Sequence, residues 1–145
     1  MVSNEQLYAE AQQASHHAYA PYSNFRVGAA VLTQSGTIFT GCNVENVSYG
    51  NTICAERVAL VKAVSEGNQA IEAIAIYTDT GDLSPCGICR QFIREFGPNI
   101  RVIYQSSGVL ISGVISKLLP DAFSTGHLTE TLEEQLRSPL KRLTP

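Results

Sequence analysis

Cysteines at two separate places in the chain restrict its fold more than any other feature. Cys54 opens the segment Cys54-Ala55-Glu56, and two more stand three residues apart in Pro85-Cys86-Gly87-Ile88-Cys89. Each segment begins a predicted helix, where backbone N–H groups and the helix dipole favour thiolates. Two cysteines at this spacing can direct both sulfurs at one metal ion, and Cys54 would add a third. The pattern therefore predicts a fold that brings the starts of two helices together.

The number of ligands separates a catalytic metal from a structural one. A structural zinc site is closed by four protein ligands, whereas a catalytic site keeps one position for water. Three cysteines beside the carboxylate of Glu56 therefore predict catalytic zinc. Two alternatives remain: Cys42 as the fourth ligand of a structural zinc, or a redox-active CxxC pair. Cys42 lies in an apolar strand-like run, where a buried free cysteine is ordinary, and the CxxC lacks a thioredoxin-like context.

Glu56 and Arg57 follow Cys54 closely enough to share its site. Bound zinc lowers the pKa of its water to roughly 7, and a carboxylate beside that water can move its proton. Glu56 is the predicted catalytic residue; a solvated glutamate favoured by the helix dipole is the ordinary alternative. Arg57 could offset the excess negative charge that three thiolates place around a dication. A surface arginine is equally compatible with the sequence.

Hydrophobic patterning predicts an α/β fold in which strands and helices alternate after an initial helix and hairpin. We expect three layers, α/β/α, with a mixed sheet of about five strands. The expected elements are a helix capped by Ser3, a hairpin of 27–33 and 37–42, a helix over 53–66, a strand over 72–78, a helix over 87–96, and strands over 101–105 and 109–115.

The length of 145 residues fits one domain, which we place at 1–128, followed by a polar tail at 129–145 that we expect to be disordered or a short helix. The net charge of −3 disfavours binding to the phosphate backbone of a nucleic acid, so no nucleic-acid partner is expected. No apolar run reaches the roughly 18 to 20 residues of a membrane span, and the N-terminus does not resemble a signal peptide. We expect a cytoplasmic protein, with a nuclear pool left open.

Residues 58–64 read Val-Ala-Leu-Val-Lys-Ala-Val, which is apolar almost all round the helix. Such a helix is buried on every side. The sheet would cover one side, and either a second copy of the chain or another helix would cover the other.

Several motifs in order resemble the cytidine deaminase family, specifically its small homotetrameric form. The shared zinc-deaminase signature has the form H-x-E…P-C-x-x-C, with a Cys₃ variant. The motifs that carry the resemblance are Phe25-Arg26-Val27-Gly28-Ala29-Ala30, Thr40-Gly41-Cys42-Asn43-Val44-Glu45-Asn46, Thr52-Ile53-Cys54-Ala55-Glu56-Arg57 and Ser84-Pro85-Cys86-Gly87-Ile88-Cys89-Arg90-Gln91.

The resemblance implies substrate-binding roles for five further residues. Asn43 and Glu45 match the residues that hydrogen-bond the ribose hydroxyl, and Phe25 matches the aromatic residue that packs on the pyrimidine. Tyr49 and Phe123 match residues that a neighbouring subunit contributes. From the residues alone, a polar turn and core packing are the ordinary alternatives. Val47 departs from the alanine common in the family and could narrow the pocket slightly.

The resemblance also implies a reaction. Cytidine and 2′-deoxycytidine would be hydrolysed to the uridine products and ammonia, as a step of pyrimidine salvage. Zinc-bound hydroxide would attack C4 while Glu56 protonates N3 and then the leaving amine. The rivals are a blasticidin S deaminase, an editor of single-stranded nucleic acid, and a non-catalytic zinc-stabilised binding module.

Overall fold

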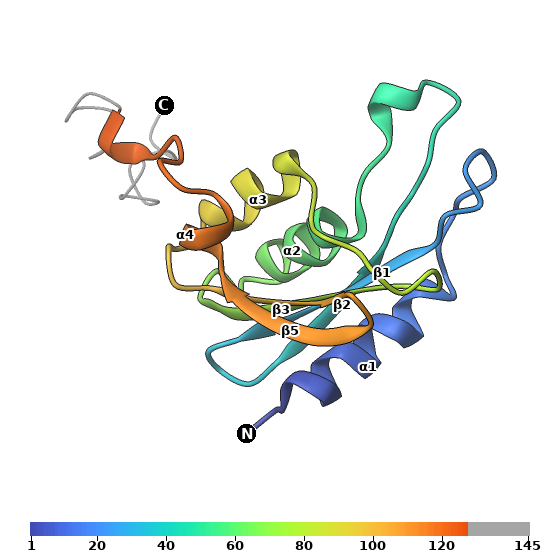
Figure 1. The fold of residues 1–145 in the computed structure, drawn as a ribbon. Coiled ribbons are helices and arrows are strands. Elements are labelled where there is room, and N and C mark those ends of the chain that lie inside the picture. Colours follow the sequence, from blue (N-terminus) through green and yellow to red (C-terminus); the bar gives the residue numbers. More distant parts are fainter. Residues whose placement is uncertain (128–145) are drawn as a thin grey trace.

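A computed structural model describes residues 1–127 of the chain, built around one five-stranded sheet (Figure 1). The strand order is β2-β1-β3-β4-β5. The described elements are α1 (Asn4–Ser15), β1 (Val27–Thr33), β2 (Ile38–Cys42), η1 (Tyr49–Asn51), α2 (Ala55–Ser65), β3 (Ile71–Thr78), α3 (Gly87–Arg94), β4 (Arg101–Ser106), β5 (Val109–Val114), α4 (Ile115–Leu118) and η2 (Thr125–His127).

The sheet mixes strand directions. β1 pairs antiparallel with β2 and with β3, β3 pairs parallel with β4, and β4 pairs antiparallel with β5. The parallel pair needs a crossover connection, and α3 supplies it. β1 is buried along its whole length because helices cover the sheet on both faces.

Helix α1 lies against one face of the sheet, and α2, α3 and α4 lie on the other (Figure 1). Leu7 and Ala11 of α1 join a core cluster with Ala30 and Ile103, whereas Leu60 of α2 joins the opposite cluster. A close approach fixes α2 on the sheet: a Cβ on Gly41 of β2 would lie 2.5 Å from the Ala59 nitrogen. Glycine at this position lets the helix that follows Cys54 rest directly on the strand.

The predicted three-layer fold with a mixed five-stranded sheet is confirmed, and the observed element bounds differ from the predicted ones by at most two residues. α4 was not predicted, because a four-residue helix carries too little periodicity to detect. The predicted domain end at 128 and the tail at 129–145 lie outside the described residues. Within 1–127, every helix is too short or too polar to cross a membrane.

Burial of α2 is less complete than its composition predicts. Ala59, Leu60 and Ala63 are fully buried against the sheet, but Val61 on the far side is 47% exposed. Within one chain, the second apolar face of the helix is therefore left partly open.

Candidate active site

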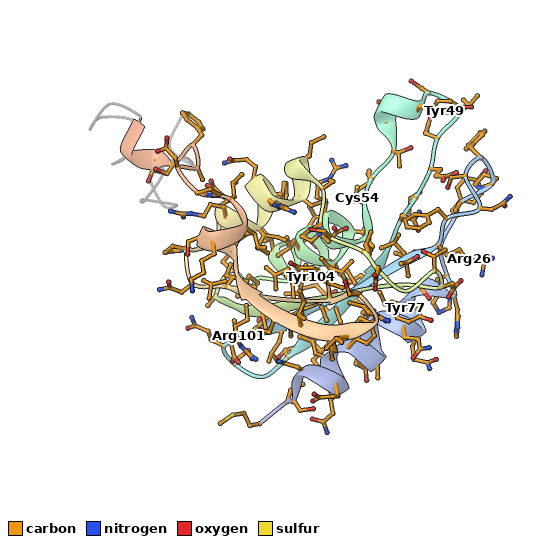
Figure 2. The ribbon with its side chains drawn as sticks, in the orientation of Figure 1. Arg26, Tyr49, Cys54, Tyr77, Arg101 and Tyr104 are labelled. Carbon is orange, nitrogen blue, oxygen red and sulfur yellow. The ribbon has the colours of Figure 1, made fainter. Side chains whose placement is uncertain are left out.

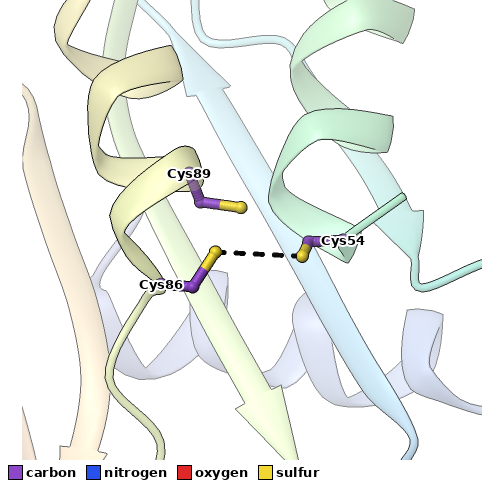
Figure 3. Close-up of side chains that lie close together, drawn as sticks. All are labelled: Cys54, Cys86 and Cys89. Carbon is purple, nitrogen blue, oxygen red and sulfur yellow. Dashed lines mark hydrogen bonds between the residues drawn. The ribbon is translucent and has the colours of Figure 1, made fainter. Parts of the chain in front are cut away.

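The starts of α2 and α3 meet above the sheet, and they carry the three cysteines singled out in the sequence. Cys54 is the N-cap residue of α2 and Cys86 that of α3, and Cys89 lies in the first turn of α3. We call these residues the thiol cluster; Figure 3 shows their sulfurs directed toward one another. Both helix N-termini therefore direct their positive ends at the same place.

The sulfur geometry suits one tetrahedral metal ion. The three sulfurs lie within 4.8 Å of one another, and the Cys54 and Cys86 sulfurs are 4.0 Å apart. Zinc bonds thiolates at about 2.3 Å, which places two sulfurs of a tetrahedral site roughly 3.8 Å apart. The fit therefore requires only small movements. Cys42 is not among the residues that converge here, so within residues 1–127 the arrangement is a three-ligand one.

Charge and hydrogen bonding prepare the cluster for a cation. A hydrogen bond from the Cys89 thiol lowers the pKa of Cys54 to about 5, and Arg57 contributes to the same shift. The same hydrogen bond, together with burial, raises the pKa of Cys89. A metal ion bound here would displace the thiol proton of Cys89, because metals bind thiolates rather than thiols.

Glu56 occupies the first turn of α2, beside the thiol cluster, and is only 4% exposed. Burial raises the pKa of this carboxyl to about 7, and the negative charge of Cys54 adds to the effect. A carboxyl that titrates near neutral pH can both accept and donate a proton under physiological conditions, which suits general acid–base catalysis. Desolvation thus gives Glu56 a property that an exposed glutamate lacks.

Arg57 lies against the outside of the cluster. Its Nη2 donates to the Thr52 carbonyl at 3.1 Å and to the Cys54 sulfur at 3.9 Å. Its Nε is buried and has no hydrogen-bond partner among the described residues. The guanidinium is therefore placed where it can offset thiolate charge, as the sequence suggests.

A pocket of about 280 Å³ opens over these groups. Such a volume lies just below the usual range of about 300–1,000 Å³ for small-molecule sites. Its lining combines reactive, polar and apolar side chains: Ser23, Phe25, Val27, Asn43, Glu45, Thr52, Cys54, Ala55, Glu56, Leu83, Ser84 and Cys86.

Asn43, Glu45 and Phe25 form one side of the pocket, which we call the loop wall. The Asn43 amide accepts from the Val27 backbone N–H at 2.9 Å and donates to the Phe25 carbonyl at 2.7 Å. One Glu45 oxygen accepts from the backbone N–H groups of Tyr22 and Ser23, at 2.8 and 3.3 Å. Both polar side chains therefore bind the chain on either side of Phe25, whatever their contacts with a ligand.

The structure does not bring Tyr49 and Phe123 into this pocket. Tyr49 lies in η1, on the projecting segment that leads into α2, and is 75% exposed (Figure 2). It lines an adjoining hollow of about 250 Å³ that shares Ser23, Glu45 and Thr52 with the pocket. Phe123 is 62% exposed, and its carbonyl accepts from the Gln91 side chain on α3 at 3.0 Å.

Comparison with known proteins gives the family. Residues 1–106 match the model of the cytidine and deoxycytidylate deaminase zinc-binding region. The chain is 47% identical over 133 residues to a cytidine deaminase of Sporosarcina psychrophila, covering 90% of this chain and 98% of that protein. The chain belongs to the cytidine deaminase family. The resemblance expected from the sequence motifs is confirmed, and the family is a zinc-binding one.

Solved cytidine deaminases share the fold. The crystal structure of the enzyme from Burkholderia pseudomallei superimposes with a TM-score of 0.79 at 45% identity, covering 83% of this chain and 99% of that one. A blasticidin-S deaminase of Bacillus cereus is also similar, at 34% identity over 103 residues, or 65% of this chain and 74% of that protein. The rival deaminase is thus a related protein, and the comparison with the cytidine deaminase extends over more of the chain.

Two functional candidates in this cytidine deaminase fold were missed in the sequence. Arg90 donates to the Pro85 carbonyl, the Ser84 hydroxyl and the Leu118 carbonyl, at 2.8, 2.7 and 2.7 Å. It thereby fixes the loop that enters Cys86 against α4. The position of Arg90, one residue after Cys89, could have identified it from the sequence. The second candidate, Ser23, lies in a polar turn, and no sequence pattern distinguishes it.

Proposed function

We propose that this chain catalyses the hydrolytic deamination of cytidine and 2′-deoxycytidine to uridine and 2′-deoxyuridine, with release of ammonia. One observation carries the proposal: the buried Glu56 shares a pocket with two cysteines of the thiol cluster and with the loop wall. A proton-transfer group, a three-ligand metal position and a polar wall together are what hydrolysis of a small ring substrate requires.

Cys54, Cys86 and Cys89 would hold the zinc ion, and Arg57 would offset their charge. When bound, zinc supplies an activated water at neutral pH. Glu56 accepts a proton from the attacking water and delivers it to ring N3 as C4 is attacked. It then takes the remaining proton from the new C4 hydroxyl and passes it to the departing amine, so that ammonia leaves as the C4 carbonyl forms. Since burial sets the pKa of Glu56 to about 7, both directions of transfer are accessible at that pH.

The loop wall would select the substrate. Asn43 and Glu45 can donate to and accept from a sugar hydroxyl, and the Phe25 ring can pack against the pyrimidine. Asn43 is 8% exposed and Phe25 is 37% exposed, and both line the pocket. The adjoining hollow beside Tyr49 could receive the far side of the sugar.

The proposed assembly is a homotetramer in which Tyr49 and Phe123 complete the site of a neighbouring chain. Support comes from apolar side chains left exposed on one chain, including Val61 of α2 at 47% and Ile88 of α3 at 66%. A shallow groove of about 550 Å³ runs along α3 from Gly87 to Phe96. Exposed apolar patches of this kind mark interaction surfaces. We further propose a role in pyrimidine salvage and a cytoplasmic location.

The test follows ultraviolet absorbance with cytidine, deoxycytidine, blasticidin S and a short cytosine oligonucleotide in parallel. We expect turnover of both nucleosides and none of the oligonucleotide, since the net charge of −3 disfavours a phosphate backbone. Turnover of the oligonucleotide without the nucleosides would overturn the proposal. Turnover of blasticidin S alone would assign the site to the rival deaminase.

A further inference from the structure

A serine outside the four motifs named above stands between Glu45 and Phe25. The Ser23 hydroxyl donates to one oxygen of the Glu45 carboxylate and accepts from the Phe25 backbone N–H at 3.0 Å. One hydroxyl can make both contacts, because it carries one donor hydrogen and two acceptor lone pairs. Ser23 also lines the pocket beside these two residues.

Phe25 precedes β1, so sheet pairing does not fix its backbone. Side chains fix it instead: the Phe25 carbonyl accepts from the Asn43 amide at 2.7 Å, and the Phe25 N–H donates to Ser23. Both backbone polar groups of Phe25, its N–H and its carbonyl, are thus hydrogen-bonded to side chains. The direction in which the Phe25 ring faces the pocket depends on these two contacts.

Glu45, which accepts the hydrogen bond from Ser23, is itself held by several hydrogen bonds. Its other carboxylate oxygen accepts from the Tyr22 and Ser23 N–H groups, and its own N–H donates to the Tyr19 carbonyl at 2.8 Å. A hydrogen bond to an ionised carboxylate is stronger than one between neutral groups. Glu45 therefore restrains the Ser23 hydroxyl, and the Ser23 hydroxyl in turn restrains the backbone of Phe25.

We propose that Ser23 is a positioning residue that couples Glu45 to Phe25 and thereby sets the affinity of the pocket for a nucleoside. The inference rests on the proposed function, since it concerns the same pocket. Loss of the hydroxyl frees the Phe25 N–H and releases one Glu45 oxygen, so the wall loosens before substrate binds. The thiol cluster and Glu56 lie on the helices and keep their geometry.

A matched pair of variants isolates the hydroxyl. Ser23→Thr and Ser23→Val have nearly the same size and branching and differ in whether a hydroxyl is present. We expect KM for cytidine to be about tenfold higher in Ser23→Val than in Ser23→Thr, as for loss of one hydrogen bond to a charged group. kcat should agree within about twofold, the range expected of surface substitutions, and zinc content should be equal. Ser35→Ala, which removes a turn hydroxyl near Thr33 and Thr37, serves as a control with unchanged KM.

Equal KM values in the Thr and Val variants would overturn the inference. So would a Val variant whose kcat falls while KM stays constant, because a general loss of folded enzyme has that signature. Wild-type enzyme that does not deaminate cytidine would instead overturn the proposed function, so the two failures are distinguishable.

A double-mutant cycle tests the route through Phe25. In a Phe25→Ala background the ring that Ser23 positions is absent, so we expect Ser23→Val to change KM by less than about twofold relative to Ser23→Thr. Independent, multiplicative effects of the two substitutions would show that Ser23 does not act through Phe25 and would overturn the coupling.

Discussion

The thiol cluster and the loop wall face the same pocket but are held in different ways. Cys54, Cys86 and Glu56 stand at the starts of α2 and α3, whose buried side chains join the core on one side of the sheet. The loop wall is held by side-chain contacts to backbone groups of a turn that precedes β1. Rigid elements position side chains more accurately than loops do. The proposed catalytic groups are therefore held by helices of one chain, whereas the proposed substrate contacts depend on a looser frame.

Removal of a cluster cysteine should have the largest effect. Cys86→Ala leaves two sulfurs, so we expect zinc to be lost and activity to fall to the limit of detection, measured by metal analysis and nucleoside turnover. Cys42→Ser is the matched control and should retain both. Loss of zinc from the Cys42 variant would mean that the metal site is closed and structural.

Replacing Glu56 should separate metal binding from catalysis. Glu56→Gln keeps the shape of the side chain and removes its titration, so we expect kcat to fall by about 10²- to 10⁴-fold with zinc retained. Parallel zinc analysis and steady-state kinetics check this. Near-normal kcat in a folded, zinc-loaded variant would refute the role given to Glu56.

Arg57 should have an intermediate effect. Arg57→Ala removes the guanidinium beside the Cys54 sulfur, and groups in this outer position typically change metal affinity or activity by about 10- to 100-fold. We expect faster transfer of zinc to a chromogenic chelator. The rate of zinc transfer from Arg57→Lys, which keeps the charge, should lie between the rates of Arg57→Ala and the wild type. An unchanged rate of zinc transfer in Arg57→Ala would show that Arg57 does not contribute to zinc binding.

Replacing Asn43 should affect both the stability of the protein and the binding of substrate at the loop wall. Asn43→Ala leaves the Phe25 carbonyl and the Val27 N–H without their partners, at a cost of about 1–3 kcal/mol in the free energy of unfolding. KM should rise with zinc content unchanged. Urea unfolding and kinetics measure the two effects. A variant with raised KM and wild-type stability would indicate that Asn43 acts only on the substrate.

The sequence allowed prediction of the thiol cluster because its signal is local: cysteines at two helix starts. The layers and most element bounds could also be predicted, because the spacing of apolar residues indicates which face of each element is buried. The strand order depends on long-range pairing, such as β3 with β4, and no local pattern encodes that. For the same reason, the bonds of Asn43 to residues 16 and 18 positions away could not be foreseen. Ser23 was missed because one serine in a polar turn has no distinguishing spacing.

We propose that the metal centre belongs to one chain while the substrate site is completed by another. Mixed assemblies of Glu56→Gln and Phe123→Ala chains test this division. Alone, the first should be inactive and the second should have a KM raised about tenfold, as for loss of an aromatic contact at an interface. In the mixture, a chain with intact Glu56 can receive Phe123 from its neighbour.

We therefore predict that co-assembled chains show higher kcat/KM, per Phe123→Ala chain, than that variant alone. Chains mixed without exchange should equal the sum of the two separate activities. A co-assembled sample that also equals the sum, or a Phe123→Ala enzyme with wild-type KM, would contradict the claim.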